Sequence, residues 1–224
     1  MRGDVVGIVG ESGSGKSTLA RCIVRLLDPD SGAIELGGVD FGGLAGEALR
    51  RQRHLVQMVF QDPYASLNPR RSVGDLVTQG LIARGTKRAD AIARAKELFA
   101  LVGLDPAATD RLPHEFSGGQ RQRIGLARAL ALEPKVLVAD EAVSALDVSV
   151  QAQVLKLLVE LRDKLSLSMI FITHDLRVAA QICDRIAIMQ RGEVVEHGVT
   201  ADIFAAPKHP YTQKLLSAVP GRAN

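Results

Sequence analysis

The sequence is poor in the residues that mark several large classes of protein. It contains no tryptophan, and aromatic residues make up only 4% of its 224 positions, too few for a surface that stacks single-stranded nucleic acid. Its apolar stretches all fall short of the roughly 20 residues that a membrane-spanning helix needs. The N-terminus carries Arg2, Asp4 and early glycines and does not look like a secretory signal. We therefore expect a soluble, cytoplasmic protein that serves a membrane only through a partner.

Cysteine is nearly absent, and no excess of charge of one sign marks the chain. Cys22 and Cys183 are far apart in the sequence and flanked by aliphatic residues, which favours two small buried hydrophobic residues in a reducing compartment. The formal net charge is +3, with Lys and Arg spread along the chain. Charge alone therefore neither indicates nor excludes an anionic partner.

Short apolar runs alternate with helical patterns along most of the chain. Four runs are typical of buried strands: Val5–Val9, Val56–Phe60, Val136–Ala139 and Met169–Ile172. A helical face from Leu19 to Leu27 follows the first run, and a longer apolar stripe from Val150 to Leu165 separates the last two. Such alternation predicts a parallel sheet covered by helices on both faces.

The middle and the end of the chain follow other patterns. Residues 72–132 show helical patterns and no good strand, and their clearest apolar stripe is Ile92, Ala95, Leu98, Phe99 and Val102. Two short strands, Ile186–Met189 and Val194–Glu196, then flank a predicted hairpin turn. From Thr200 onward, proline interrupts what we expect to be short helices.

A glycine-rich segment follows the first predicted strand and precedes the first predicted helix: Gly10-Glu11-Ser12-Gly13-Ser14-Gly15-Lys16-Ser17. It fits the phosphate-loop pattern, in which backbone N–H groups surround a β-phosphate and the helix N-terminus adds partial positive charge. We expect Lys16 to reach the β- and γ-phosphates and Ser17 to ligate Mg²⁺, with Thr18 completing the phosphate half of the site. The alternative is a glycine-rich turn that precedes a helix by chance.

Two carboxylates, Asp140 and Glu141, end the predicted strand that begins at Val136. A phosphate loop implies Mg²⁺, and an acid at the tip of a neighbouring strand is well placed to support that ion. We assign this role to Asp140, through a water, and the role of general base to Glu141. Considered without the phosphate loop, the pair is often only the start of a solvated loop.

These patterns predict an α/β fold of the P-loop NTPase type. We expect one domain in which residues 1–70 and 131–199 form a nucleotide-binding core with a parallel sheet. Residues 71–130 form an inserted all-helical lobe, and residues 200–224 form a C-terminal tail.

A second glycine-rich helix start lies at Ser117-Gly118-Gly119-Gln120. Exposed N–H groups and a hydroxyl there would make a second anion site. Since the chain has one phosphate loop, this site would serve the nucleotide of another copy. The alternative is a helix cap with flexible glycines.

Taken together, the motifs resemble the nucleotide-binding domains of ATP-binding-cassette transporters over nearly the whole chain. Residues 117–120 resemble the family's signature, with Phe116 where leucine is usual. Gln61 resembles the Q-loop glutamine, which touches Mg²⁺ and the attacking water. Residues 144–147, ending in Asp147, resemble the D-loop, and His174 resembles the switch histidine.

The resemblance implies the mechanism, the ligands and the partners. Two cassettes, identical or related, would meet head to tail and bury two molecules of ATP, with Mg²⁺, between the phosphate loop of one and the signature of the other. His174 would hold the γ-phosphate and the attacking water, as a neutral donor or by sharing a proton with Glu141; otherwise such a histidine is a structural hydrogen bonder. The partners would be integral membrane permease subunits and, indirectly, a substrate-binding protein, with no nucleic acid. The chain would sit peripherally on the inner face of the cell membrane.

Two segments resemble the ATPases of dipeptide, oligopeptide and nickel importers in particular. They are Phe60–Pro69 and His209-Pro210-Tyr211-Thr212. In such ATPases the first segment receives a short helix from the membrane subunit, and Tyr64 and Leu67 would supply apolar contacts to it. The alternative is that both side chains pack on the helical lobe.

Three departures from the family pattern lead to further expectations. Family members usually carry two strands before the first one here, with an aromatic ring that stacks on adenine, so we expect an incomplete chain with weak nucleotide binding. The chain also stops soon after Tyr211, and Ala142 stands where proline is commoner. A nucleotide-binding module without turnover is therefore one alternative. A cassette ATPase of DNA repair or chromosome structure is another, and the lack of a long coiled coil before Ser117 disfavours it.

Overall fold

Six strands form the central sheet of the described residues, which are 3–62, 66–144 and 146–218 of the computed structural model. Their order across the sheet is β4-β5-β6-β1-β7-β8. Five strands are mutually parallel: β4 (Val56–Val59), β5 (Val136–Asp140), β6 (Ser168–Thr173), β1 (Val5–Val9) and β7 (Arg185–Gln190). The last, β8 (Glu193–Val199), runs antiparallel to β7. All four predicted buried strands are confirmed, as is the final hairpin.

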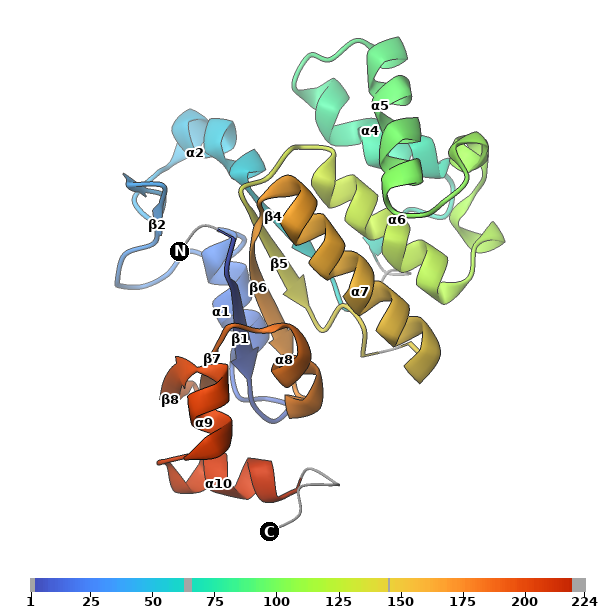
Figure 1. Ribbon diagram of the computed structural model, residues 1–224. Helices are drawn as coiled ribbons and strands as arrows, with labels where there is room; N and C mark the ends of the chain where they lie inside the picture. The colour runs from blue at the N-terminus through green and yellow to red at the C-terminus, as the bar shows by residue number, and fades with distance from the viewer. Residues whose placement is uncertain (1–2, 63–65, 145, 219–224) are drawn as a thin grey trace.

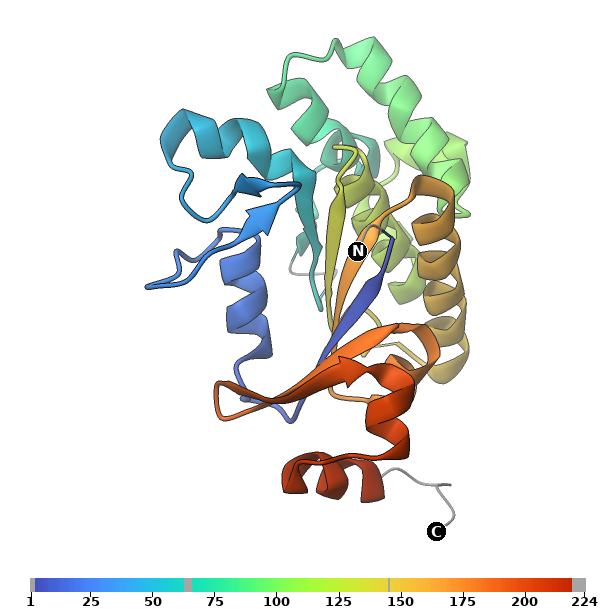
Figure 2. The same ribbon diagram turned by 60° about the vertical axis from the view of Figure 1, so that its left-hand side comes forward.

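Alternate residues of each strand point into two apolar cores, one on each face of the sheet. Val5 and Val9 of β1 belong to the larger core, while Ile8 belongs to the smaller. Helix α1 (Lys16–Ile23) covers the face of the smaller core, and α7 (Val148–Leu165) and α8 (Leu176–Ile182) cover the other (Figures 1 and 2). This is the layering that the alternation of strands and helices predicts.

The described residues between 72 and 132 contain helices and no strand, as the sequence patterns predict. They form α4 (Val73–Ala83), α5 (Arg88–Leu101) and α6 (Gly118–Leu130), with the short 3₁₀ helices Pro106–Asp110 and Pro113–Glu115 between the last two. Most of the predicted stripe faces inward. Ile92 is partly exposed, whereas the other members are buried: Ala95, Leu98, Phe99 and Val102. These helices gather at the end of the sheet that carries β4 (Figure 1).

The first helix ends earlier than the sequence predicts. Arg25 adopts a left-handed backbone conformation (φ 57°), and the chain leaves the helix there. Its buried guanidinium donates to the Phe41 carbonyl at 2.7 Å, which ties this turn to the following segment. Leu26 and Leu27, expected on the buried helical face, are instead 52% and 43% exposed.

The segment after this turn contains elements that the sequence patterns did not reveal. Strands β2 (Glu35–Leu36) and β3 (Val39–Asp40) pair across Gly37 and Gly38, both with positive φ, as a tight hairpin turn requires. Helix α2 (Gly46–Gln52) and the 3₁₀ helix Arg53–Leu55 follow. The Gly-Gly pair was the available signal, but two-residue strands are too short to show a period.

The C-terminal elements match the predicted helices broken by proline. Helices α9 (Thr200–Ala205) and α10 (Pro210–Ser217) lie beyond β8, at the carboxyl end of β1 (Figure 2). Of the two cysteines, Cys183 is buried as predicted and Cys22 is only partly buried. None of the helices within the described ranges has the length and apolar character needed to cross a membrane.

Candidate functional site

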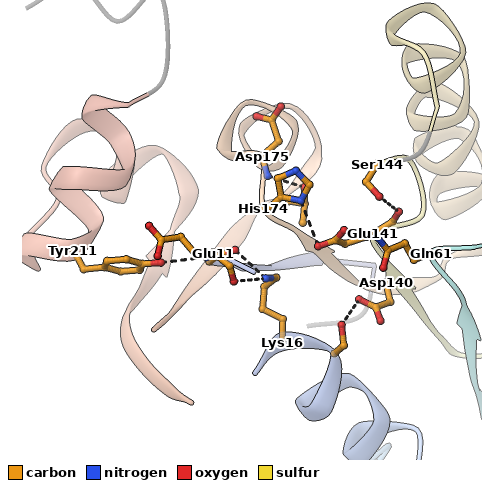
Figure 3. A network of polar contacts seen from close by, with 12 residues as sticks. Glu11, Lys16, Gln61, Asp140, Glu141, Ser144, His174, Asp175 and Tyr211 are labelled. Carbon is orange, nitrogen blue, oxygen red and sulfur yellow. Dashed lines mark hydrogen bonds and ion pairs between the residues drawn. The ribbon is translucent and has the colours of Figure 1, made fainter. Parts of the chain in front are cut away.

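The candidate site lies where four neighbouring strands end at the same edge of the sheet. β4, β5, β6 and β1 are adjacent and parallel, so the residues that follow them are brought together although they are distant in the sequence. Figure 3 shows this gathering, and the residues are Gln61 after β4, Asp140 and Glu141 at the end of β5, His174 after β6, and Glu11 and Lys16 after β1. The sequence-predicted catalytic and metal-binding residues therefore converge.

Glycine is required at two positions of the loop between β1 and α1. A Cβ on Gly10 would lie 2.2 Å from the Met189 carbonyl oxygen, a distance that no side chain tolerates. Gly15 has φ 100° and occupies the N-cap of α1, where no described side chain caps the helix. The first N–H groups of α1 are therefore left for a ligand, which is the geometry of an anion site.

The Lys16 side chain folds back over the loop. Its Nζ is 2.9 Å from the Gly10 carbonyl and 2.8 Å from the Glu11 carbonyl, and the residue is only 4% exposed. Burial lowers the pKa of Lys16, while Glu141 and Asp140 oppose that shift. An ammonium group held in this way is ready to exchange carbonyl oxygens for the oxygens of an anionic ligand.

The other residues of the loop lie around this ammonium. The Ser14 hydroxyl is buried and has no hydrogen-bond partner among the described residues, so it has hydrogen-bonding capacity to spare for a ligand oxygen. Glu11, Ser12 and Gly13 are exposed, as is Thr18 in the first turn of α1.

Ser17 and Asp140 form a pair of oxygen ligands between α1 and β5. The Ser17 hydroxyl donates to Asp140 at 3.1 Å. Burial raises the pKa of the Asp140 carboxyl, and the hydrogen bond from Ser17 opposes this shift. A cation bound nearby would favour the ionised form. No group of three or more His, Cys, Asp or Glu side chains with metal-binding geometry occurs in the described part of the chain. A divalent ion here would therefore also use hydroxyl, amide and ligand oxygens, which suits Mg²⁺.

The Glu141 carboxylate is oriented by the two neighbouring strands. Gln61 donates to one of its oxygens at 3.0 Å, and His174 Nδ1 lies 3.3 Å from the other. Its backbone has φ 46°, in the left-handed region that non-glycine residues rarely adopt and that often occurs at functional sites. The Ser144 hydroxyl donates to the Glu141 carbonyl at 3.0 Å and supports this turn (Figure 3).

The second glycine-rich helix start is closed by its own side chains. Ser117 and Gln120 form a capping box, with Ser117 Oγ accepting from the Gln120 amide and Gln120 Oε1 accepting from the Ser117 amide at 2.8 Å. Gly118 is partly exposed, and Gly119 packs so closely on Val150 that a Cβ would lie 2.4 Å from that side chain. The helix cap is thus realised, and a role toward the nucleotide of another chain stays a prediction.

Asp147 likewise caps a helix. Its carboxylate accepts from the Val150 amide at 3.0 Å and from the Ser149 hydroxyl at 2.8 Å at the start of α7. These hydrogen bonds lower the pKa of the Asp147 carboxyl. The preceding residue of the predicted D-loop motif, Leu146, lies against Gly118, where an added Cβ would be 3.7 Å away. Ala145 falls outside the described residues.

One expected contact surface needs correction. Leu67 is 3% exposed and belongs to the larger apolar core, so it supports packing and is not available to a partner. Tyr64 lies outside the described residues.

The sequence patterns missed a contact to the phosphate-loop segment. Tyr211 of α10 accepts a hydrogen bond from the Glu11 amide at 3.1 Å. The two residues are 200 positions apart, and no local pattern links them.

Comparison with known proteins connects this site to a family. The sequence profile described as "ABC transporter" matches residues 1–144, and the profile "Oligopeptide/dipeptide transporter, C-terminal region" matches residues 195–223. A putative peptide import ATP-binding protein of Brucella ovis is 51% identical over 98% of this chain and 69% of its own length. An oligopeptide transport ATP-binding protein, OppF, of Streptococcus mutans is 50% identical over 97% of this chain and 71% of its own.

Solved structures show the same similarity. The structure of cbiO1 from Clostridium perfringens, part of the ABC transporter complex cbiONQ, superposes with a TM-score of 0.82 at 31% identity, over 91% of this chain and 80% of that one. A dimer of the ATP-binding cassette MJ0796, bound to ADP and phosphate, gives a TM-score of 0.79 at 30% identity, over 89% of this chain and 87% of that one.

Proposed function

The chain belongs to the ATP-binding-cassette transporter family, and we propose that it is the ATP-hydrolysing subunit of an importer for peptides or a related small solute. One observation carries the proposal: the ends of four adjacent strands bring together Lys16, Ser17, Gln61, Asp140, Glu141 and His174. The substrate class is supported by the printed names of relatives, which describe peptide, oligopeptide and glutathione import. The match to the C-terminal region of oligopeptide and dipeptide transporters supports it too.

We expect the triphosphate of ATP to lie over the loop at the start of α1. Lys16 exchanges the Gly10 and Glu11 carbonyls for the β- and γ-phosphates, a change from neutral to charge-assisted hydrogen bonds. The buried Ser14 hydroxyl, which lacks a partner among the described residues, supports a polar ligand here.

Mg²⁺ fits the donor set beside the loop. The Ser17 hydroxyl and the Gln61 amide oxygen would be its ligands, and Asp140 would hold it through a water. When bound, the ion neutralises negative charge on the phosphate oxygens. The support for this assignment is the 3.1 Å contact between Ser17 and Asp140, because it joins a hydroxyl and a carboxylate at the mouth of the loop.

Glu141 is the proposed general base. Its two oxygens already meet Gln61 and His174, so the carboxylate is oriented before a nucleotide arrives. Such preorganisation lets it accept a proton from water without rearrangement. His174 and Gln61 position the water and the γ-phosphate around it.

The site is completed by a second ATPase chain, identical or related. Ser117, Gly118, Gly119, Gln120 and Asp147 lie at the starts of α6 and α7, and we propose that they face the nucleotide held by the other chain. The solved dimer that contains ADP and phosphate supports an arrangement of two chains.

A groove beside the site is the proposed contact with the membrane subunits. It has a volume of about 780 Å³ and is lined at one end by Ser17, Gln61 and Asp140 and at the other by α4 residues such as Leu76 and Gln79. A helix of a permease seated in it would touch the surroundings of Gln61, so that nucleotide state and permease conformation could influence each other. The chain would then act from the inner face of the membrane.

Hydrolysis assays with Mg²⁺ and ATP test the proposal. We expect turnover by the chain assembled with its membrane subunits and loss of turnover on Glu141→Gln, with nucleotide binding retained. Binding without turnover in the full assembly would support instead a nucleotide-binding module that does not hydrolyse ATP.

A further inference from the structure

We propose that Tyr211, near the C-terminus, is a positioning residue for the phosphate loop. Its hydroxyl accepts the hydrogen bond of the Glu11 amide and holds the beginning of the loop in the conformation that binds nucleotide. The inference rests on the proposed function of the loop, and it gives the C-terminal region a part in nucleotide binding.

The contact bridges a space that packing leaves open. A cleft of about 490 Å³ separates the loop from α10, lined on one side by Glu11 and Ser12 and on the other by Tyr211 and Lys214. Across this cleft the Tyr211 hydroxyl meets the Glu11 amide at 3.1 Å (Figure 3). The Glu11 amide at the entrance of the loop is therefore held toward α10 by a directional hydrogen bond and not by close packing.

The Tyr211 hydroxyl is held rigidly enough for this role. The residue is 6% exposed, and it belongs to the larger apolar core. The Glu196 carboxylate on β8 accepts from the Lys208 and His209 amides at 2.9 and 3.0 Å. His209 in turn accepts from the Tyr211 amide at 3.2 Å. The hydroxyl thus stands at the end of a chain of contacts that begins in the sheet.

The same sheet edge supports the loop at a second point. The turn between β7 and β8 donates from the Gly192 amide to the Ser14 carbonyl at 3.0 Å. Since β8 also carries Glu196, one hairpin supports the loop directly at Ser14 and indirectly, through α10, at Glu11. The C-terminal third of the chain therefore contacts the loop at two positions, Glu11 and Ser14.

Nucleotide binding would make the Tyr211 contact more important. The backbone of Glu11 makes contacts through both of its polar groups. Its N–H donates to Tyr211, and its C=O accepts from Lys16 at 2.8 Å and from the Ser14 amide at 3.2 Å. When Lys16 turns to the phosphates it gives up that carbonyl. Among the contacts described, the Glu11 backbone is then held by the Tyr211 hydroxyl at its N–H and by the Ser14 amide at its C=O. Loss of the Tyr211 hydroxyl therefore weakens the nucleotide-bound state as well as the free one.

The test compares Tyr211→Phe with the unaltered chain and with Ser217→Ala. Phenylalanine keeps the buried ring and removes only the hydroxyl. Ser217→Ala removes an exposed hydroxyl from the same helix, where it contacts only the Lys214 carbonyl among the contacts described. We measure the affinity for Mg²⁺-ATP, KM and kcat in the assembled transporter, the melting temperature, and amide hydrogen exchange of the loop without nucleotide.

For Tyr211→Phe we expect the dissociation constant and KM for ATP to rise about 3- to 10-fold, the factor that one neutral hydrogen bond supports. We expect kcat to stay within about twofold, because the general base is untouched. The Glu11 amide should exchange faster in the variant even without ligand, while Ser217→Ala should match the unaltered chain in all measurements. A residue that only packs would change the melting temperature and leave KM and local exchange alone.

A double-mutant cycle tests the path from the sheet. If Glu196 acts through Tyr211, Glu196→Gln raises KM in the unaltered background and adds little to Tyr211→Phe. Fully additive effects would overturn that path. Unchanged KM and unchanged Glu11 exchange in Tyr211→Phe would overturn the inference while the proposed function stands. Absence of ATP binding by the unaltered assembly would overturn both.

Discussion

Helices α1 and α6 both begin at glycine-rich turns, and their first turns are completed in opposite ways. Helix α1 starts at Gly15 without a described side-chain cap, and the partly exposed Ser17, which follows the buried Lys16, donates to Asp140 at the end of β5. Helix α6 starts at Ser117, which forms a reciprocal capping box with Gln120. The first helix start is open and surrounded by charge, whereas the second is closed by its own residues.

The difference indicates which site a single chain can build. An uncapped helix start leaves N–H donors in need of an acceptor. The end of β5 supplies the carboxylates that can support a cation bound together with an anionic acceptor. The start of α6 is already capped and needs no ligand for its own stability. An anion that binds there must therefore be held mainly by other groups. A second chain carrying a bound nucleotide would meet that requirement.

The largest expected effect breaks the chemistry at the open site. Glu141→Gln keeps the shape and the contacts to Gln61 and His174 but removes the base, so hydrolysis should fall by about 10²- to 10⁴-fold. ATP affinity should stay close to that of the unaltered chain, and ATP-bound dimers should accumulate. Turnover near the unaltered rate, measured as phosphate release by the assembled transporter, would place the base elsewhere, with His174 as the next candidate.

The next effect removes the charge that the open site offers to phosphate. Lys16→Ala should weaken ATP binding by about 100-fold, since hydrogen bonds to charged groups contribute up to about 3 kcal/mol. Calorimetric titration with Mg²⁺-ATP measures it. Lys156→Ala, which removes an exposed lysine of α7 paired with Glu160, is the matched control and should bind ATP normally. Equal affinity in Lys16→Ala and Lys156→Ala would remove Lys16 from the site.

A pair of substitutions at Ser117 separates the cap from the proposed nucleotide contact at the closed site. Ser117→Ala removes the cap and should lower stability by about 1 kcal/mol. Ser117→Asp keeps a capping oxygen but adds a negative charge where we expect the γ-phosphate of the other chain. It should therefore fold normally and lose ATP-dependent dimerisation by several-fold, read by light scattering. Normal dimerisation of Ser117→Asp would restrict this residue to the role of a cap.

The two sites also differ in how far the sequence alone could predict them. The phosphate loop and the acids after β5 follow directly from strand and motif patterns, because parallel strands bring consecutive strand ends to one edge. The strands of the sheet and the helices after residue 72 could also be predicted. Their apolar residues recur over segments long enough to show the period of a strand or a helix.

What could not be predicted depends on contacts between distant residues. Helix α1 ends early where Arg25 turns away and donates to the Phe41 carbonyl. Leu67 is buried in the larger apolar core, among residues that are distant from it in the sequence. The hydrogen bond from Glu11 to Tyr211 joins positions 200 residues apart. Motifs report the chemistry that a local segment can perform, but they do not report which remote side chain holds that segment in place.

The smallest expected effect sharpens the comparison, because it measures what the open site costs in stability when no ligand is present. Burial raises the pKa of Asp140 above its ordinary value of 3.8, so the ionised carboxylate is less favourable in the folded chain than in the unfolded one. Above the raised pKa this penalty is fully present. It shrinks as the pH falls through that pKa and is gone below 3.8, where the carboxyl is protonated in both the folded and the unfolded chain.

Asp140→Asn keeps an oxygen for the Ser17 hydroxyl and removes the charge, so without ligand it should melt above the unaltered chain at pH 7. The size of the difference measures the penalty, at roughly 2–4 °C for each 1 kcal/mol in a chain of this size. The difference should shrink as the pH is lowered toward 4, because the unaltered chain loses its penalty there.

Saturating Mg²⁺-ATP should reverse the order, since a ligand at about 100 times its dissociation constant adds about 2.7 kcal/mol and the variant binds the ion less well. Scanning calorimetry over this pH range, with and without Mg²⁺-ATP, distinguishes the outcomes. A variant that melts below the unaltered chain in the absence of ligand would mean that the Asp140 charge stabilises the empty fold, and the contrast between an open and a closed helix start would then not be one of stability.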